Sequence, residues 1–266
     1  MRPYRLSQLI STLVQLSYYP ALWSGAIYQG VTKQFCVPIL TCWGCPLMRF
    51  GCPMGALQYF IGVREFPFYI LGFFVFIGAT VGRMACAWLC PFGLLQDLLK
   101  KITKIKLSLP NWTTYIKYLV LIVIGVIAVY ITQEPWFCKL CPAGMLEAGL
   151  PLVLADQRGD LKALVGWLFK LKLGILLGVI LGSIFIKRFF CRVLCPIGAI
   201  YSVFNRISIL QMKTDSEKCG TKKCNLCRQV CPMDINIYEN PKAKECIRCL
   251  ECKHRCPKVA VGVGFK

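Results

Sequence analysis

The sequence predicts a mainly α-helical protein in two parts: a four-helix transmembrane bundle with internal duplication, then a small soluble α+β domain. Three observations lead to this fold class. The 266 residues are 56% hydrophobic, with a mean hydropathy of +0.57, which is too apolar for a soluble chain. The 18 cysteines recur in short, regularly spaced groups. The last groups fall in a polar segment, 211–266, which we separate from a membrane region, 1–210.

Four stretches without acidic residues predict the transmembrane helices, at about 7–30, 66–83, 112–132 and 163–186. Each can cross most or all of the roughly 30 Å of hydrocarbon in a bilayer. In the last stretch Lys170 and Lys172 interrupt the apolar pattern. Gly174, Gly178 and Gly182 then form a face of small residues that would let two helices approach closely. Glycine as ordinary filler of a membrane helix is the alternative.

Four spans place both termini on one side of the membrane, and the basic residues indicate which side. With the N-terminus inside, the inner segments before the soluble domain carry twelve Lys and Arg, against eight at most in the outer loops. Residues 94–106 mix leucine with lysine at helical spacing, which predicts an amphipathic helix at the membrane surface. We therefore expect a multi-pass protein of the cell membrane, in contact with the lipid bilayer, with both termini and the soluble domain in the cytoplasm.

The soluble domain contains two cysteine series, each ending in Cys-Pro. The second series is C-x2-C-x2-C-x3-C-P, the ligand spacing of two-cluster bacterial ferredoxins, in which the fourth cysteine binds the other cluster. The first series differs in having four residues between its first two cysteines, which lengthens a loop. Structural zinc is the alternative, but a zinc site has no reason to repeat such a series. The predicted [4Fe-4S] ligand sets are Cys219, Cys224, Cys227 with Cys256, and Cys246, Cys249, Cys252 with Cys231.

The motif C-P-x-G occurs four times in the membrane region and predicts a duplication. In each half, one helix leads to a C-P-x-G loop outside and the next leads to C-x3-C-P-x-G inside. Residues four apart are neighbours on a helix, so each C-x3-C places two sulfurs on one face. The two inner motifs together supply the four thiolates of a third cluster: Cys86, Cys90, Cys191 and Cys195.

The outer face offers six cysteines for a fourth cluster: Cys36, Cys42, Cys45, Cys52, Cys138 and Cys141. By symmetry Cys52 corresponds to Cys141, and Cys42 with Cys45 forms a C-x2-C pair like that of Cys138 with Cys141. One cluster leaves two cysteines over. These can form a disulfide on the oxidising side of the membrane, or contribute to a second centre.

Composition argues against several other functions. The net charge of +20 would suit nucleic acid, but no recognition motif occurs, and the basic residues follow the membrane sides. The single histidine, His254, lies in the soluble tail and no C-x2-C-H motif occurs, so we expect no haem. No acidic residue lies in a predicted span, which argues against proton transport.

The chain resembles membrane-bound polyferredoxins related to NapH, NosR and CcoG, a group of 4Fe-4S binding membrane proteins. The resemblance rests on C-x3-C-P-x-G at Cys86 and Cys191, and on the tail from Cys219 to Pro257. The outer motifs at Cys42 and Phe137 resemble a less studied branch. The resemblance implies electron transfer, with other redox subunits, such as a flavin or catalytic subunit, as partners.

We expect a membrane-integral electron-transfer subunit between the quinone pool, or an outer-face redox partner, and a cytoplasmic redox partner. The clusters perform the chemistry, so we expect no catalytic residue and a subunit of an oxidoreductase complex, not an enzyme alone. A redox sensor, or a metalloenzyme maturation factor of the NosR and CcoG type, is the alternative. Glu65, Gln96 and Asp97 could line a quinone pocket, although polar residues at helix ends are more often interface residues. The lysine pair at 222–223 predicts an acidic partner.

Overall fold

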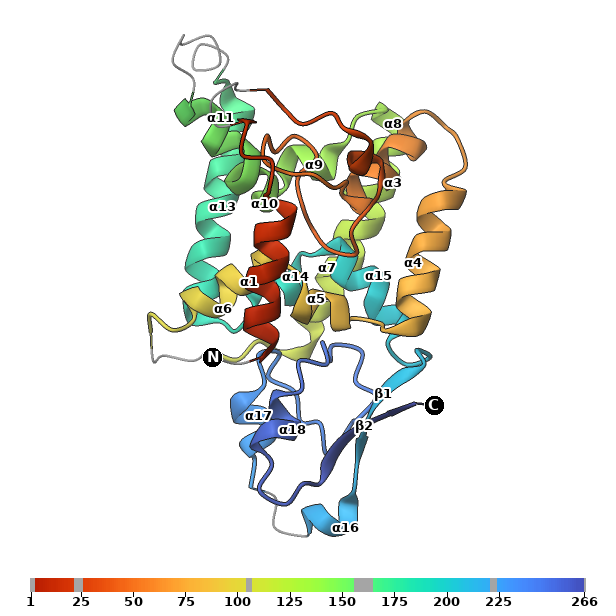
Figure 1. Ribbon diagram of the computed structural model, residues 1–266, viewed down its shortest axis with the longest axis vertical. Helices are drawn as coiled ribbons and strands as arrows, with labels where there is room; N and C mark the ends of the chain where they lie inside the picture. The colour runs from red at the N-terminus through yellow and green to blue at the C-terminus, as the bar shows by residue number, and fades with distance from the viewer. Residues whose placement is uncertain (1–2, 22–25, 104–106, 156–164, 221–223, 266) are drawn as a thin grey trace.

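The computed structural model describes all residues except 1–2, 22–25, 104–106, 156–164, 221–223 and 266. A helical region occupies one end of the molecule, and a small domain with a two-stranded sheet occupies the other (Figure 1). The first helix begins at the end of the helical region that faces this small domain. The structure is therefore mainly helical, as predicted.

Long helices surround the helical region and turn apolar side chains outward. They are α1 (Pro3–Gln15), α4 (Phe68–Thr80), α13 (Trp167–Phe185) and a continuous helix made of η2 (Asn111–Tyr115), α7 (Ile116–Leu119), the π-helical η3 (Val120–Ile127) and α8 (Ala128–Thr132). Phe76, Ile131 and Leu181 are 66%, 72% and 58% exposed. Within the described chain, two of these helices, Trp112–Thr132 and Trp167–Phe185, are long and apolar enough to cross a membrane.

The first predicted span differs most from the structure. The expected helix at 7–30 ends at Gln15, and the described residues between Gln15 and η1 (Val31–Gln34) form no long helix. The buried face of α1 is polar: Gln8 Nε2 donates to Cys90 O at 3.3 Å, and Gln15 Nε2 to Leu89 O at 3.5 Å. These hydrogen bonds from glutamine side chains hold α1 against the core. The helix has 13 residues and is therefore only about 20 Å long. The second predicted span, 66–83, is likewise reduced to the 13 residues of α4.

The glycine face predicted on the last span does not pack against a neighbour. An added Cβ at Gly174 or Gly178 would meet nothing within 4 Å in the described structure, and at Gly182 it would meet only the ring of Phe189 among its nearest atoms. The interpretation of close helix approach is therefore wrong within this chain for Gly174 and Gly178. The amphipathic helix expected at 94–106 corresponds to the shorter helix α6 (Pro91–Leu99). Residues 104–106 lie outside the described residues.

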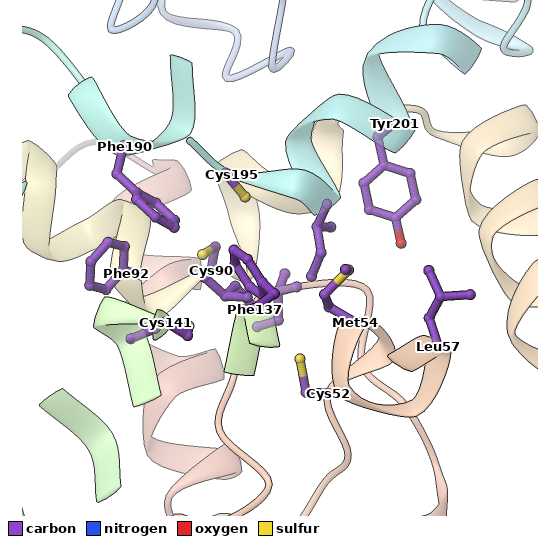
Figure 2. Packing of buried hydrophobic residues seen from close by; sticks show 14 of the residues in the cluster. Cys52, Met54, Leu57, Cys90, Phe92, Phe137, Cys141, Phe190, Cys195 and Tyr201 are labelled. Carbon is purple, nitrogen blue, oxygen red and sulfur yellow. The ribbon is translucent and has the colours of Figure 1, made fainter. Parts of the chain in front are cut away.

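Short helices fill the space between the long ones. They are α3 (Pro53–Gly62), α5 (Met84–Trp88), α6 (Pro91–Leu99), α9 (Trp136–Leu140), α10 (Pro142–Gly144), η4 (Met145–Gly149), α11 (Leu150–Ala155), α14 (Phe189–Val193) and α15 (Pro196–Phe204). Their buried side chains form the main core, in which cysteines pack with aromatic rings (Figure 2). Phe92 and Phe190, for example, meet edge to face with centroids 5.0 Å apart. The cysteine-bearing segments therefore lie inside the helical region and not on its surface.

The small domain is closed by pairing its first and last strands. Strand β1 (Leu210–Thr214) runs antiparallel to β2 (Val261–Phe265), in the register Leu210 to Phe265 and Thr214 to Val261. Between them lie α16 (Ser216–Cys219), α17 (Leu226–Val230) and α18 (Glu251–Arg255). Asp215 caps α16 by accepting from the Glu217 and Lys218 amides, and the Lys218 amide is the main reason that the pKa of this carboxyl is lowered.

Buried polar side chains join the two parts. Arg248, in the small domain, donates to Val81 O at 2.7 Å and to Asn205 O at 2.8 Å. In return, Asn205 Nδ2 donates to Ala243 O at 2.9 Å, and Trp88 Nε1 donates to Arg248 O at 3.1 Å. These bonds are shielded from water, so they hold the small domain in one place against the inner helix ends.

Candidate metal centres

The eight cysteines of the small domain line two adjoining cavities. One cavity is lined by Cys219, Cys224, Cys227 and Cys256, and the other by Cys231, Cys246, Cys249, Cys252 and, again, Cys227. The structure thus brings together the two sets that the ferredoxin spacing predicts, including the exchange of the fourth cysteine. Cys227 lies in the wall that the cavities share.

The exchange follows from a local structure that occurs twice. Helices α17 and α18 pack together, and each starts after a residue in the left-handed region, Asn225 at φ 53° and Leu250 at φ 62°. Each ends at the cysteine of a Cys-Pro pair, Cys231 or Cys256, in extended conformation. Proline cannot continue a helix, so the chain turns away and carries that sulfur toward the other cavity.

The thiols of the small domain suit a multi-iron cluster better than a single ion. Burial raises the pKa of the Cys246 thiol to about 11 and that of Cys252 to about 12, so metal binding must displace protons. Structural zinc needs its four ligands within about 2.3 Å of one atom, whereas these sulfurs surround a space.

All four C-P-x-G motifs form the same helix start, in α3, α6, α10 and α15. The cysteine is the extended residue before the helix, and proline is the first helical residue. In α15 the glycine amide three residues on also donates back to the cysteine sulfur, from Gly198 N to Cys195 Sγ at 3.4 Å. Each sulfur therefore lies at a helix N-terminus, where the backbone dipoles favour a thiolate.

The motif glycines also let the two halves approach each other. An added Cβ at Gly55 would lie 3.7 Å from Cys138 Sγ, and one at Gly144 would lie 3.3 Å from Cys42 Sγ. On the inner side, an added Cβ at Gly198 would lie 3.1 Å from Arg83 Nη2. Each of these contacts joins a residue before position 100 to one after it, so the halves meet around their cysteines.

The predicted inner set is gathered at the inner ends of the helices. Each of Cys86, Cys90, Cys191 and Cys195 lies within electrostatic range of the other three. Gln96 Nε2 donates to Cys191 Sγ at 3.1 Å, and Gln96 Oε1 accepts from the amide of Phe190 at 3.0 Å. Both polar atoms of the Gln96 side chain are therefore hydrogen-bonded at this site.

Two arginines beside the inner set were not recognised from the sequence. Arg83 and Arg188 are 0% and 1% exposed. Arg188 pairs with Asp97, with Nη2 to Oδ2 at 2.7 Å, so Asp97 is a charge partner here. The missed signal is that both inner motifs read R-x2-C-x3-C-P-x-G, which extends the repeat by one basic residue. Glu65, the third residue considered for quinone, is exposed in the loop before α4.

Four of the six outer cysteines interact electrostatically with one another. Each of Cys42, Cys52, Cys138 and Cys141 lies within electrostatic range of the other three. The Cys36 thiol interacts electrostatically with the Cys52 thiol. All six are free thiols, so the disulfide considered for the two remaining cysteines is not formed in the structure.

Charged side chains accompany the outer set as well. Lys172, which interrupts the apolar pattern of the sequence, turns inward, and its Nζ donates to Cys138 O at 3.2 Å. An added Cβ at Gly144 would lie 3.3 Å from this Nζ. Glu147 accepts from the amide of Cys42 at 2.8 Å. Lys170, two residues away, is exposed. The lysine that breaks the apolar pattern is therefore part of the site.

The cysteine sets adjoin one another in order along the molecule. Cys52 and Cys141 of the outer set and Cys90 and Cys195 of the inner set belong to one packed core (Figure 2). A second buried cluster joins Cys86 of the inner set to Cys231 and Cys249 of the small domain, through Ala87, Met233 and Ile247. The last two sets share the wall at Cys227.

Comparison with known proteins identifies the family. The 4Fe-4S binding domain family matches residues 65–110, 118–150 and 171–214. The uncharacterized protein MJ0750 of Methanocaldococcus jannaschii is 32% identical over 80% of this chain and 86% of its own length. The chain belongs to the 4Fe-4S binding domain family. The matched segments contain the inner set and the pair Cys138 and Cys141.

Other members carry names from electron transport. The putative electron transport protein YccM of Escherichia coli is 27% identical over 69% of this chain and 51% of its own length. The ferredoxin-type protein NapH of the same organism is 25% identical over 65% of this chain and 59% of its own length, and the regulatory protein NosR also matches. The resemblance to NapH- and NosR-like polyferredoxins is confirmed. No solved structure matches the chain significantly.

Proposed function

We propose that this chain is a multi-pass membrane subunit that holds four [4Fe-4S] clusters in series. The observation that carries the proposal is the order of the cysteine sets, from the outer set through the inner set to the two cavities of the small domain. When bound, such clusters supply one-electron transfer at potentials set by their surroundings. The chain contributes placement, charge and exclusion of water. It is thus an electron-transfer subunit and not an enzyme by itself.

The proposal assigns each cysteine set to one cluster. The ligands of the two clusters in the small domain are the sets that line its cavities, and those of the inner cluster are Cys86, Cys90, Cys191 and Cys195. For the outer cluster we choose Cys42, Cys52, Cys138 and Cys141, because each of these four thiols interacts electrostatically with the other three. In this assignment Cys36 and Cys45 are not ligands of the outer cluster.

We place the chain in the cell membrane with the small domain in the cytoplasm. The outward apolar faces of α1, α4, α8 and α13 favour lipid contact, and lipid also explains why so many large apolar side chains are exposed. The excess of basic residues on the segments near the small domain favours the orientation. We also propose that the two halves arose by duplication, since their C-P-x-G glycines make reciprocal contacts.

The proposed partners are a quinone or outer redox protein on one side and a cytoplasmic redox protein on the other. A cavity of about 160 Å³ opens where α1, α6 and the small domain meet. Besides Tyr4, Asp97 and Cys231, its lining includes the cations Arg5, Lys100, Lys101, Lys187 and Arg188. We propose this cavity for the quinone. Labelling by a photoreactive quinone at these residues supports the assignment, and labelling only at lipid-exposed helices contradicts it.

A redox sensor or maturation factor is the second candidate, because NosR is named a regulatory protein. The two functions differ in how partners bind. A conduit copurifies in fixed ratio with a catalytic or flavin subunit, whereas a maturation factor associates transiently. Quantitative analysis of the complex purified under anaerobic conditions separates these outcomes.

The deciding experiment uses the full chain in sealed vesicles. A reduced viologen is enclosed inside, and an impermeant acceptor is added outside. Wild-type protein should carry electrons across, whereas Cys195→Ala should stop transfer and leave both EPR signals of the small domain in place. Transfer at the wild-type rate in Cys195→Ala contradicts the series arrangement. Iron and sulfide analysis provides the cluster count in each sample.

A further inference from the structure

Arg83 and Arg188 occupy equivalent places beside the inner cysteine set and reach across to the opposite half. Arg83 Nη2 donates to Cys191 O at 3.2 Å, and Arg188 Nη1 donates to Cys86 O at 3.4 Å. An added Cβ would lie 3.1 Å from Arg83 at Gly198, and 3.6 Å from Arg188 at Gly93. The two side chains therefore make the same contacts with exchanged partners.

Their remaining donors differ. Arg188 places Nε and Nη2 on the two carboxylate oxygens of Asp97, at 2.9 and 2.7 Å, which satisfies both groups. Arg83 places Nη1 on Glu245 at 2.5 Å, but its Nε has no acceptor among the described residues although the side chain is completely buried. A buried charged donor without a partner is costly and calls for an explanation.

The charge around Arg83 also differs from that around Arg188. Glu245 is shared by Arg83 and by the buried Lys117, so two cations face one carboxylate and one net positive charge remains. Arg188 and Asp97 balance each other. Arg83 lies within electrostatic range of Cys86 and Cys191, and also of Cys246 in the small domain. The unsatisfied donor and the excess charge therefore coincide at the junction of two cysteine sets.

We propose that Arg83 Nε donates a hydrogen bond to a sulfur of the cluster held by the inner set, and that this bond raises the reduction potential of that cluster. The inference rests on the proposed function, because it requires the inner cluster. A hydrogen bond to sulfur and a nearby cation both favour the reduced, more negative state. Arg188 Nε is already bonded to Asp97, so the equivalent donor in the other half is not available to the cluster. Arg83 is a positioning residue that makes the halves functionally unequal.

The test uses the full chain purified with its clusters under anaerobic conditions. Arg83→Lys keeps the positive charge but loses the Nε donor, and Arg188→Lys is the matched control at the equivalent position. In an EPR-monitored redox titration, Arg83→Lys should lower the equilibrium constant for reduction of the inner cluster about tenfold. This corresponds to a reduction potential lower by ~59 mV for one electron. Arg188→Lys also keeps its charge but removes no unpaired donor, so it should shift this potential less than Arg83→Lys does. Equal potentials in Arg83→Lys and wild type overturn the proposal.

A second measurement does not depend on the stability of Arg83→Lys. Arginine labelled with ¹⁵N is incorporated into the Arg188→Lys protein, and pulsed EPR is recorded on the reduced inner cluster. A coupled arginine nitrogen together with an exchangeable proton supports the bond. Their absence in a sample that retains the inner cluster shows that water, and not the cluster, satisfies Nε. Absence of an inner cluster from wild-type protein contradicts the proposed function instead.

Discussion

Replacing Gly198 by alanine tests the close approach of the two halves. The new methyl group would lie 3.1 Å from Arg83 Nη2 and 3.4 Å from Cys191 O. Arg83 cannot swing away freely, because it is buried and bonded to Glu245 and Cys191. Overpacking of this kind costs about 1–3 kcal/mol, and the better helix propensity of alanine returns up to ~1 kcal/mol. We expect a net loss of about 1–2 kcal/mol.

The matched control is Gly174→Ala, where an added Cβ meets nothing within 4 Å in the described structure. This change should stabilise α13 by about 0.5–1 kcal/mol, so the two substitutions should have opposite signs. The assay is thermal unfolding in detergent under anaerobic conditions, followed by loss of the visible cluster absorbance. At roughly 2–4 °C per kcal/mol, Gly198→Ala should lower the midpoint by a few degrees. A Gly198→Ala protein as stable as Gly174→Ala would refute the packing argument.

Three further changes test the outer set and the partner surface. Cys138→Ala should remove the iron of one cluster, whereas Cys45→Ala should remove none; the reverse result in iron analysis would reject our choice of ligands. Lys172→Gln should lower the reduction potential of the outer cluster, because a cation that favours the reduced state is lost. The control Lys170→Gln, at an exposed position, should leave that potential unchanged. Equal potentials in the two variants contradict this role of Lys172. Charge reversal of the lysine pair at 222–223, outside the described residues, should slow transfer to the cytoplasmic partner at low salt and much less at high salt.

The cysteine motifs could be interpreted from the sequence because their geometry is local. In C-x2-C-x2-C-x3-C-P, the ligand spacing and the proline act within a single turn or loop, so the ligand sets around Cys246 and Cys219 follow from order along the chain. In the same way, C-P-x-G specifies a helix start, because proline geometry suits the first helical residue. Composition likewise indicated apolar helices, and Trp112–Thr132 and Trp167–Phe185 have the required length.

Other features depended on contacts between distant segments, which spacing does not encode. The first predicted span carries no charge from 7 to 30, but in its helix α1 Gln8 and Gln15 bond carbonyls more than 70 positions away and hold the helix against the core. The inward direction of Lys172 depends on where Cys138 lies. Sequence could count six outer cysteines, but only packing of the halves decides which four are mutually close.

What the sequence by itself determined is the chemistry: thiolates in repeated groups, joined to apolar helices and a two-series tail. What only the tertiary structure decided is how these groups relate. The duplicated motif R-x2-C-x3-C-P-x-G predicts two equal halves, yet Arg188 meets Asp97 while Arg83 meets Glu245 and retains an unpaired Nε. The difference arises because the helical region supplies Asp97 to Arg188, whereas the small domain supplies Glu245 to Arg83. Such an asymmetry comes from the packing of one domain on another, and identical local motifs cannot specify it.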